Sequence, residues 1–186
     1  MGDVKPAVIE ELVGNAHGNL ARVRELLDEH PDALNLRAPW NETAIEAATQ
    51  MGNKPIIELL IDRGAPVDFF TACVLGRIDL VTSALSADPG SANSRGVHEL
   101  PALYLAAIGG SFEVARLLLD AGADVNARSE SAAPIHGAVM GGSADMVRLL
   151  LERGADTSLP DYEGRGAPQL AEHLGSPAIA ALFDRN

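Results

Sequence analysis

The side chains that could support chemistry are a single cysteine and five histidines. A cysteine thiolate beside a histidine is the pair that a cysteine-dependent hydrolase would need. Cys73, however, lies in the apolar run Phe69-Phe-Thr-Ala-Cys-Val-Leu75, where a free cysteine behaves as a small hydrophobic residue. The other candidates have no ligand-like spacing to Cys73 or to one another: His17, His30, His98 and His173. We therefore expect no catalytic residue, no metal ligand and no cofactor.

Two Gly-Gly pairs, at 109–110 and 141–142, are also not part of a phosphate-loop pattern. They belong instead to a repeated frame. Gly110-Ser-Phe-Glu-Val-Ala-Arg-Leu-Leu-Leu-Asp-Ala-Gly-Ala-Asp-Val-Asn126 returns as the segment 142–158, and the same frame occurs at 52–68. Val114, Leu117 and Leu118 form one apolar face of a short helix in this frame, and a glycine follows that helix as a stop signal. A helix this short cannot bury its apolar face alone, so the copies must stack.

The leading glycines of the frame fix the register, since they recur at gaps of 34, 24, 34, 32 and 33 residues. They are Gly18, Gly52, Gly76, Gly110, Gly142 and Gly175. A second helix, rich in small residues, is expected before each of them. The third repeat is nine residues shorter than 33, and the missing residues all come from the loop that precedes its first helix.

This pattern resembles the ankyrin repeat, a unit of about 33 residues with a Thr-Pro-Leu-His-x-Ala segment. Ala133-Pro-Ile-His136 is the nearest match to that segment, and Gly-Ala-Asp-Val-Asn is matched better. The resemblance covers about Ile9 to Phe183. It implies an all-α solenoid of stacked helix-turn-helix repeats with short β-hairpin loops, here called fingers, and it implies that His136 ties neighbouring hairpins together. The single domain expected over 1–186 then contains repeats at 3–36, 37–68, 69–94, 95–127, 128–159 and 160–186.

Several local features are predicted from residue type. Asn41 occupies a finger position that usually holds glycine, so a positive φ is expected there. Asp68 is expected to cap a helix over 69–75, and Ser176 to cap a last helix that begins with Pro177. The second helix of the short repeat is expected over 79–85.

The charge of the chain excludes two classes of partner. Lys and Arg number 14 against 26 Asp and Glu, a net charge of −12. Such a surface repels phosphate backbones and anionic membranes, so we expect no nucleic acid and no membrane partner. The first twenty residues lack the apolar run of a signal peptide, and no segment reaches the length of a membrane span. We expect a cytoplasmic protein, and the scarcity of lysine beside abundant arginine and alanine points to a bacterial source.

The resemblance implies that a protein partner binds at the finger tips and at the exposed ends of the first helices, on the concave face. Many residues at these positions are large and apolar, as is typical of interaction surfaces. The expected partner-binding residues are Trp40, Glu42, Met51, Leu75, His98, Leu100, Ile108, Met140, Tyr162 and Arg165. The unbound chain is expected to be a monomer.

Other interpretations stay open at this point. The apolar residues could pack on one another instead of binding a partner, and the chain could be an enzyme or an enzyme subunit. The missing finger of repeat three could leave a notch, floored by Met51, Val74 and Leu75, that serves a peptide or small-molecule sensor. Either the flanking fingers close over the notch and bury Trp40, or it stays open. We expect an open notch with Trp40 as the anchor point for the partner.

Overall fold

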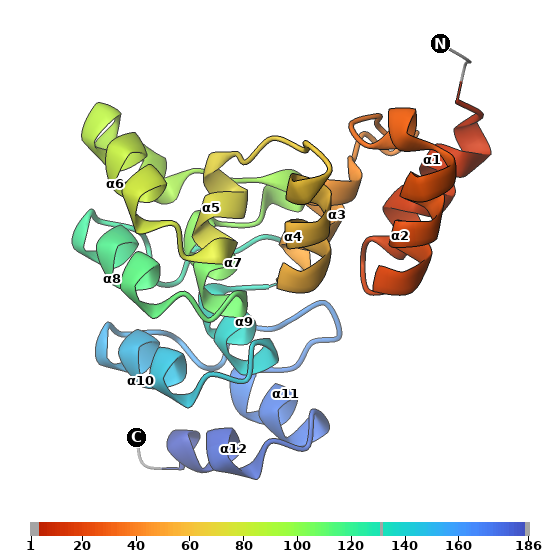
Figure 1. The fold of residues 1–186 in the computed structure, drawn as a ribbon. Helices are drawn as coiled ribbons and strands as arrows, with labels where there is room; N and C mark the ends of the chain where they lie inside the picture. Colours follow the sequence, from red (N-terminus) through yellow and green to blue (C-terminus); the bar gives the residue numbers. More distant parts are fainter. Residues whose placement is uncertain (1–3, 131, 185–186) are drawn as a thin grey trace. The chain divides into compact units, whose positions relative to one another are not determined.

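The computed structural model describes residues 4–130 and 132–184, which form short helices joined by tight turns (Figure 1). This part of the chain contains no strand, which confirms the all-α class. The α-helices are α1 (Pro6–Asn15), α2 (Leu20–Glu29), α3 (Ala44–Gln50), α4 (Lys54–Asp62), α5 (Phe69–Leu75), α6 (Ile78–Ala87), α7 (Ala102–Ile108), α8 (Phe112–Asp120), α9 (Pro134–Met140), α10 (Ala144–Glu152), α11 (Ala167–His173) and α12 (Pro177–Phe183). Three short 3-10 helices join them: η1 (Pro31–Ala33), η2 (Pro89–Asn93) and η3 (Val97–Glu99).

The chain divides into two compact units, Met1–Thr71 and Ala72–Asn186. The expectation of a single domain therefore stays a prediction. In the first unit, α1 packs against α2 and α3, and α4 packs against α2 and α3. Its core is apolar, and the side chains of Val13, Ile56 and Leu60 are completely buried.

The second unit contains two rows of helices (Figure 1). The inner helices α7, α9 and α11 pack in succession, and so do the outer helices α6, α8, α10 and α12. Val114, Leu118 and Leu150 of the outer row are completely buried, as the apolar face of the repeated frame predicts. Each helix thus buries its apolar face against its immediate neighbours, the arrangement that gives repeat proteins their nearest-neighbour energetics.

Most of the predicted local features are confirmed. Asn41 has a φ of 65°. Asp68 accepts a hydrogen bond from the Thr71 backbone N–H at 2.7 Å and so caps α5. Ser176 precedes Pro177 at the start of α12, but its side chain makes no capping hydrogen bond, so that part of the prediction is wrong. The helix expected over 79–85 is longer at both ends, because α6 runs from Ile78 to Ala87.

The Gly-Gly pairs have a structural explanation in the second unit. Gly110 and Gly142 adopt φ values of 64° and 67°, which glycine tolerates best. The first glycine of each pair allows a close backbone approach, of the end of α7 to Val74 and of the end of α9 to Ile108. A Cβ on Gly109 would lie 2.4 Å from the Val74 carbonyl oxygen, and one on Gly141 would lie 2.6 Å from that of Ile108.

The fingers are less regular than the β-hairpins that the resemblance implies. Among the described residues, the pairing is limited to one isolated bridge between Arg95 and Pro101. Other finger tips are closed by one or two backbone–backbone hydrogen bonds, for example from Ser129 N–H to the Ala132 carbonyl at 3.0 Å. These loops are therefore tight turns without a strand ladder.

Candidate functional site

The first unit presents its single tryptophan on a well-defined finger. The backbone N–H groups of Ala38 and Asn41 bond to the carbonyls of Glu42 and Ala38, both at 2.8 Å. The Trp40 indole N–H donates to Glu42 Oε2 at 2.9 Å, and 47% of the tryptophan remains exposed. The ring is therefore held at one edge while a large part of its surface faces solvent.

The base of this finger is fixed by a charged network. Arg37 binds both carboxylate oxygens of Glu46, at 2.8 and 3.0 Å, and donates to the Asn41 carbonyl at 2.6 Å. Glu46 also accepts from the backbone and side chain of Thr43, forming a capping box at the start of α3. Burial tends to raise the pKa of Glu46, but the hydrogen bonds from Thr43 and Arg37 prevail and lower it.

Next to this finger, the turn after α1 contacts the end of α3. The Gln50 amide donates to His17 Nε2, and the His17 Nδ1–H donates to the Gly14 carbonyl at 3.1 Å. His17 Nε2 lies 3.9 Å from Glu42 Oε2. Gln50 lies at a first-helix end where a partner is expected to bind, whereas the sequence pattern did not place His17 beside it. Their separation of 33 residues, about one repeat, is the signal that could have paired them.

In the second unit, two exposed apolar side chains lie at the ends of neighbouring inner helices. Met140 ends α9 and is 42% exposed, while Leu174 follows α11 and is 47% exposed. The Tyr104 hydroxyl of α7 lies 3.8 Å from the Met140 sulfur, and burial raises the pKa of Tyr104 to about 12. The Met140 sulfur is thus in contact with the hydroxyl of a buried tyrosine that stays neutral.

The last finger presents a second exposed aromatic ring. Tyr162 is 72% exposed, and the Arg165 guanidinium lies over it at 5.9 Å from the ring centre. Asp161 accepts from the backbone N–H groups of Glu163 and Arg165 and from Arg165 Nε, each at 2.8 Å. Burial tends to raise the pKa of Asp161, but the hydrogen bonds from Arg165 hold this pKa below its ordinary value. Three hydrogen bonds to Asp161 therefore hold the backbone of this tip and the Arg165 side chain in place.

Three of the residues expected at exposed positions are buried. Glu42, Leu100 and Ile108 retain 1%, 5% and 7% of their exposure. Glu42 turns inward and accepts a hydrogen bond from the indole N–H of Trp40. The backbone of Gly141 packs closely against the Ile108 carbonyl oxygen. The expectation that these three side chains are exposed was wrong.

The remaining predicted residues lie at or near the surface. Met51 is 42% exposed at the end of α3, and Leu75 is half-buried at the end of α5. His98 is exposed and, with φ at 55°, adopts the left-handed region. Trp40 belongs to the first unit and Leu100 to the second, so the notch expected between their loops stays a prediction.

Cys73 and His136 are packing residues, as expected. Both are completely buried. The Ala133 backbone N–H donates to His136 Nδ1 at 3.0 Å, so this nitrogen is the acceptor and the ring is held in one tautomer. Burial lowers the pKa of His136, although Asp161 and the carbonyls of Leu159 and Arg165 act in the opposite direction.

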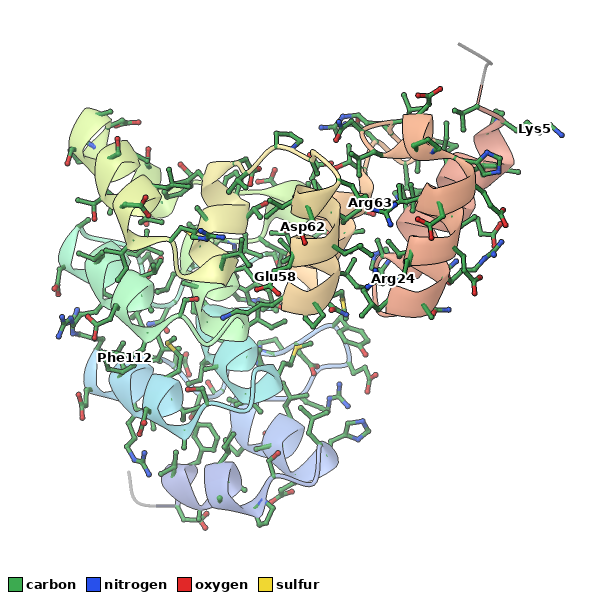
Figure 2. All side chains as sticks on the ribbon, in the orientation of Figure 1. Lys5, Arg24, Glu58, Asp62, Arg63 and Phe112 are labelled. Atoms are coloured by element: carbon green, nitrogen blue, oxygen red, sulfur yellow. The ribbon has the colours of Figure 1, made fainter. Side chains whose placement is uncertain are left out.

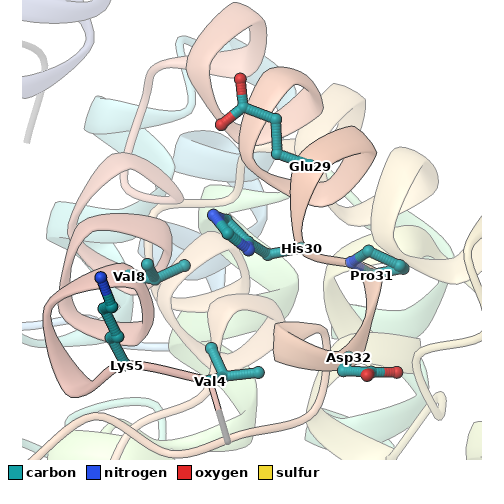
Figure 3. A pocket seen from close by; sticks show the side chains of 7 residues that line it. All are labelled: Val4, Lys5, Val8, Glu29, His30, Pro31 and Asp32. Atoms are coloured by element: carbon teal, nitrogen blue, oxygen red, sulfur yellow. The ribbon is translucent and has the colours of Figure 1, made fainter. Parts of the chain in front are cut away.

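The fold also has a shallow pocket of about 370 Å³ in the first unit, between the start of α1 and the turn after α2 (Figure 3). Both apolar and titratable side chains line it: Val4, Lys5, Val8, Glu29, His30, Pro31 and Asp32. None of the residues expected to bind a partner lines this pocket. Within residues 4–130 and 132–184, no group of three or more His, Cys, Asp or Glu side chains is arranged to hold a metal ion. In the same part of the chain, no helix has the length and apolar character needed to cross a bilayer.

Comparison with known proteins gives two findings. The chain is 29% identical over 123 residues to alpha-latrocrustotoxin-Lt1a of Latrodectus tredecimguttatus, a match that covers 61% of this chain. It spans only 9% of the length of that relative, so the similarity concerns one part of a much larger protein. The family model described as ankyrin repeats (3 copies) matches residues 69–161, half of the chain. Together with the stacked pairs of short helices, this match shows that the chain belongs to the ankyrin-repeat family.

Proposed function

We propose that this chain is a non-catalytic module that binds a protein partner through its concave face, with the finger tips and the ends of the inner helices as contact residues. Ankyrin repeats are generally protein–protein interaction modules. The observation that carries the proposal for this chain is the exposure of large apolar side chains at those positions. Met51 and Met140 are each 42% exposed, and Tyr162 is 72% exposed.

The type of these residues supports binding over packing. Methionine adapts its shape to a partner, and tyrosine and tryptophan contribute much of the binding energy in interface centres. Tyr162 and Trp40 are also held by hydrogen-bonded loops, so little conformational entropy is lost when a partner immobilises them. In this proposal the chain acts as a cytoplasmic monomer of a bacterial cell, takes a protein partner and does not bind nucleic acid.

A capture experiment with matched variants tests the proposal. The tagged chain is incubated with native lysate, and the retained proteins are compared among the wild type, Met140→Ser and Phe112→Ser. Phe112 is similarly exposed, at 36%, but it lies at the start of α8 in the outer row (Figure 2).

We expect one protein to be retained by the wild type and by Phe112→Ser and to be lost with Met140→Ser. A partner that is lost with Phe112→Ser and kept with Met140→Ser would place the interface on the outer helices and contradict the proposal. Turnover of a substrate by the purified chain would favour the enzyme alternative.

A further inference from the structure

We infer that the exposed face of Trp40 is a receptor for a positively charged side chain, an arginine or a lysine, of the protein partner. This inference rests on the proposed function and adds the chemistry of one contact. The site is built entirely within the first unit, from the finger around Trp40 and the network at its base.

The first argument concerns the electron density of the ring. The Trp40 indole N–H donates to a carboxylate oxygen of Glu42 at 2.9 Å, and Glu42 is 1% exposed. A hydrogen bond from an indole N–H to a carboxylate increases the electron density of the ring. Tryptophan is already the side chain whose face attracts cations most strongly, and the attraction increases when the contact excludes water.

The second argument concerns the position of the ring. Two backbone hydrogen bonds close the finger, and Asn41 takes the positive φ that the tip requires. Arg37, the cation closest in sequence, is bound to Glu46 and to the Asn41 carbonyl instead of stacking on the indole. The ring therefore has a fixed orientation, and 47% of the residue remains accessible.

The third argument concerns charge. The whole chain carries a net charge of −12, so a cationic partner is attracted to it and an anionic partner is repelled. The last finger offers a comparison in the second unit, because the Tyr162 ring there already has the Arg165 guanidinium over it at 5.9 Å. In this inference, the partner supplies to Trp40 the cation that Arg165 supplies to Tyr162.

The single tryptophan makes the test direct, because a ¹⁵N spectrum of the chain contains one indole N–H signal. The probes are a capped tetra-arginine peptide and a capped tetra-citrulline peptide, which has nearly the same shape without the charge. We expect the arginine peptide to shift the indole signal in a saturable way and the citrulline peptide to leave it in place. Equal shifts with both peptides, or no shift with either, would overturn the inference.

Two variants distinguish the contribution of the indole ring from general electrostatic attraction. Their affinities for the arginine peptide are measured with a fluorescent dye attached to the peptide. Trp40→Leu is expected to weaken binding about three- to fivefold, the effect of losing one cation–π contact. Glu58→Gln removes one charge from an exposed position on α4 of the same unit (Figure 2) and is expected to change binding less than about twofold. Equal losses of affinity in the two variants would show that the peptide is attracted only by the acidic surface and would overturn the inference.

The two proposals fail in different ways. If a partner is captured through Met140 while the indole does not respond to the arginine peptide, this inference is wrong and the proposed function stands. If the indole responds to the peptide while the captured partner is lost with Phe112→Ser and kept with Met140→Ser, the proposed interface is wrong and the cation binding by Trp40 stands. Trp40 is half exposed, so Trp40→Leu is expected to fold, and its circular dichroism spectrum checks this.

Discussion

At the scale of single residues, the buried side chains follow the sequence pattern closely. The apolar spacing of the repeated frame places Leu118 in the core, and its side chain has no exposure. The positive φ of Asn41 and the cap of Asp68 follow from residue type alone. The inward turn of Glu42 does not, because it depends on the indole of Trp40 two residues earlier, and nothing in the spacing encodes that hydrogen bond.

Replacement of Leu118 tests the core. Leu118→Ala should lower the free energy of unfolding by about 2–5 kcal/mol, since it leaves a cavity that the neighbouring helices fill only in part. Leu80→Ala is the control, because Leu80 is 45% exposed on α6 and should cost less than about 1 kcal/mol. Denaturant unfolding followed by circular dichroism measures both. Similar losses in the two variants would mean that the assigned core is wrong.

Burial of His136 predicts a dependence of stability on pH. Its pKa in the folded chain is below the ordinary value of 6.5, so the unfolded chain binds more protons between these two values. The stability that comes from the neutral ring is complete above about pH 6.5 and is lost as the pH falls below it. We expect the wild type to lose more unfolding free energy than His136→Gln between pH 7.5 and pH 5.5. Parallel losses would show that His136 is not the responsible group.

At the scale of the elements, the packing of the inner helices depends on backbone contacts that a sequence pattern does not reveal. The glycine pairs are visible in the sequence, but the different structural roles of the two glycines in each pair are not. The second glycine of each pair provides a positive φ, and the first provides space for the neighbouring helix. The finger loops show the same limit, since the family resemblance implies hairpins and the described residues form turns closed by one or two backbone–backbone hydrogen bonds.

The close approach of α9 to α7 can be tested at Gly141. A Cβ there would lie 2.6 Å from the Ile108 carbonyl oxygen and 3.0 Å from that of Ala107. Because both atoms belong to the backbone, Gly141→Ala should lower the unfolding free energy by about 1–3 kcal/mol. Gly18→Ala provides the control, since a Cβ at Gly18 meets nothing within 4 Å. A thermal melt in which both variants match the wild type would rule out tight packing at this position.

At the scale of the whole molecule, the repeat period was readable from the leading glycines, and the family match supports it over residues 69–161. The division into two compact units was not readable, although it falls inside the short third repeat. A periodic pattern shows which residues face a neighbour, but it does not show how strongly successive repeats are coupled. The same limit applies to the expected notch, which depends on residues from both units.

The coupling between the units can be measured with Trp40 as a reporter for the first unit. If the two units unfold separately, Leu118→Ala should lower the midpoint of the circular dichroism transition and leave the Trp40 fluorescence transition nearly unchanged. If both transitions move together, the chain unfolds as the single domain that its repeat pattern predicts.

The central claim, that a protein partner binds at the ends of the inner helices, can be tested most directly with methyl-labelled methionine. Met51 and Met140 are each 42% exposed at such ends, whereas Met146 is completely buried in α10 and serves as the internal control. Addition of the captured partner should shift and broaden the methyl signals of Met140 and Met51 and leave the Met146 signal in place. A partner that saturates the chain without moving the Met51 and Met140 signals would contradict this account.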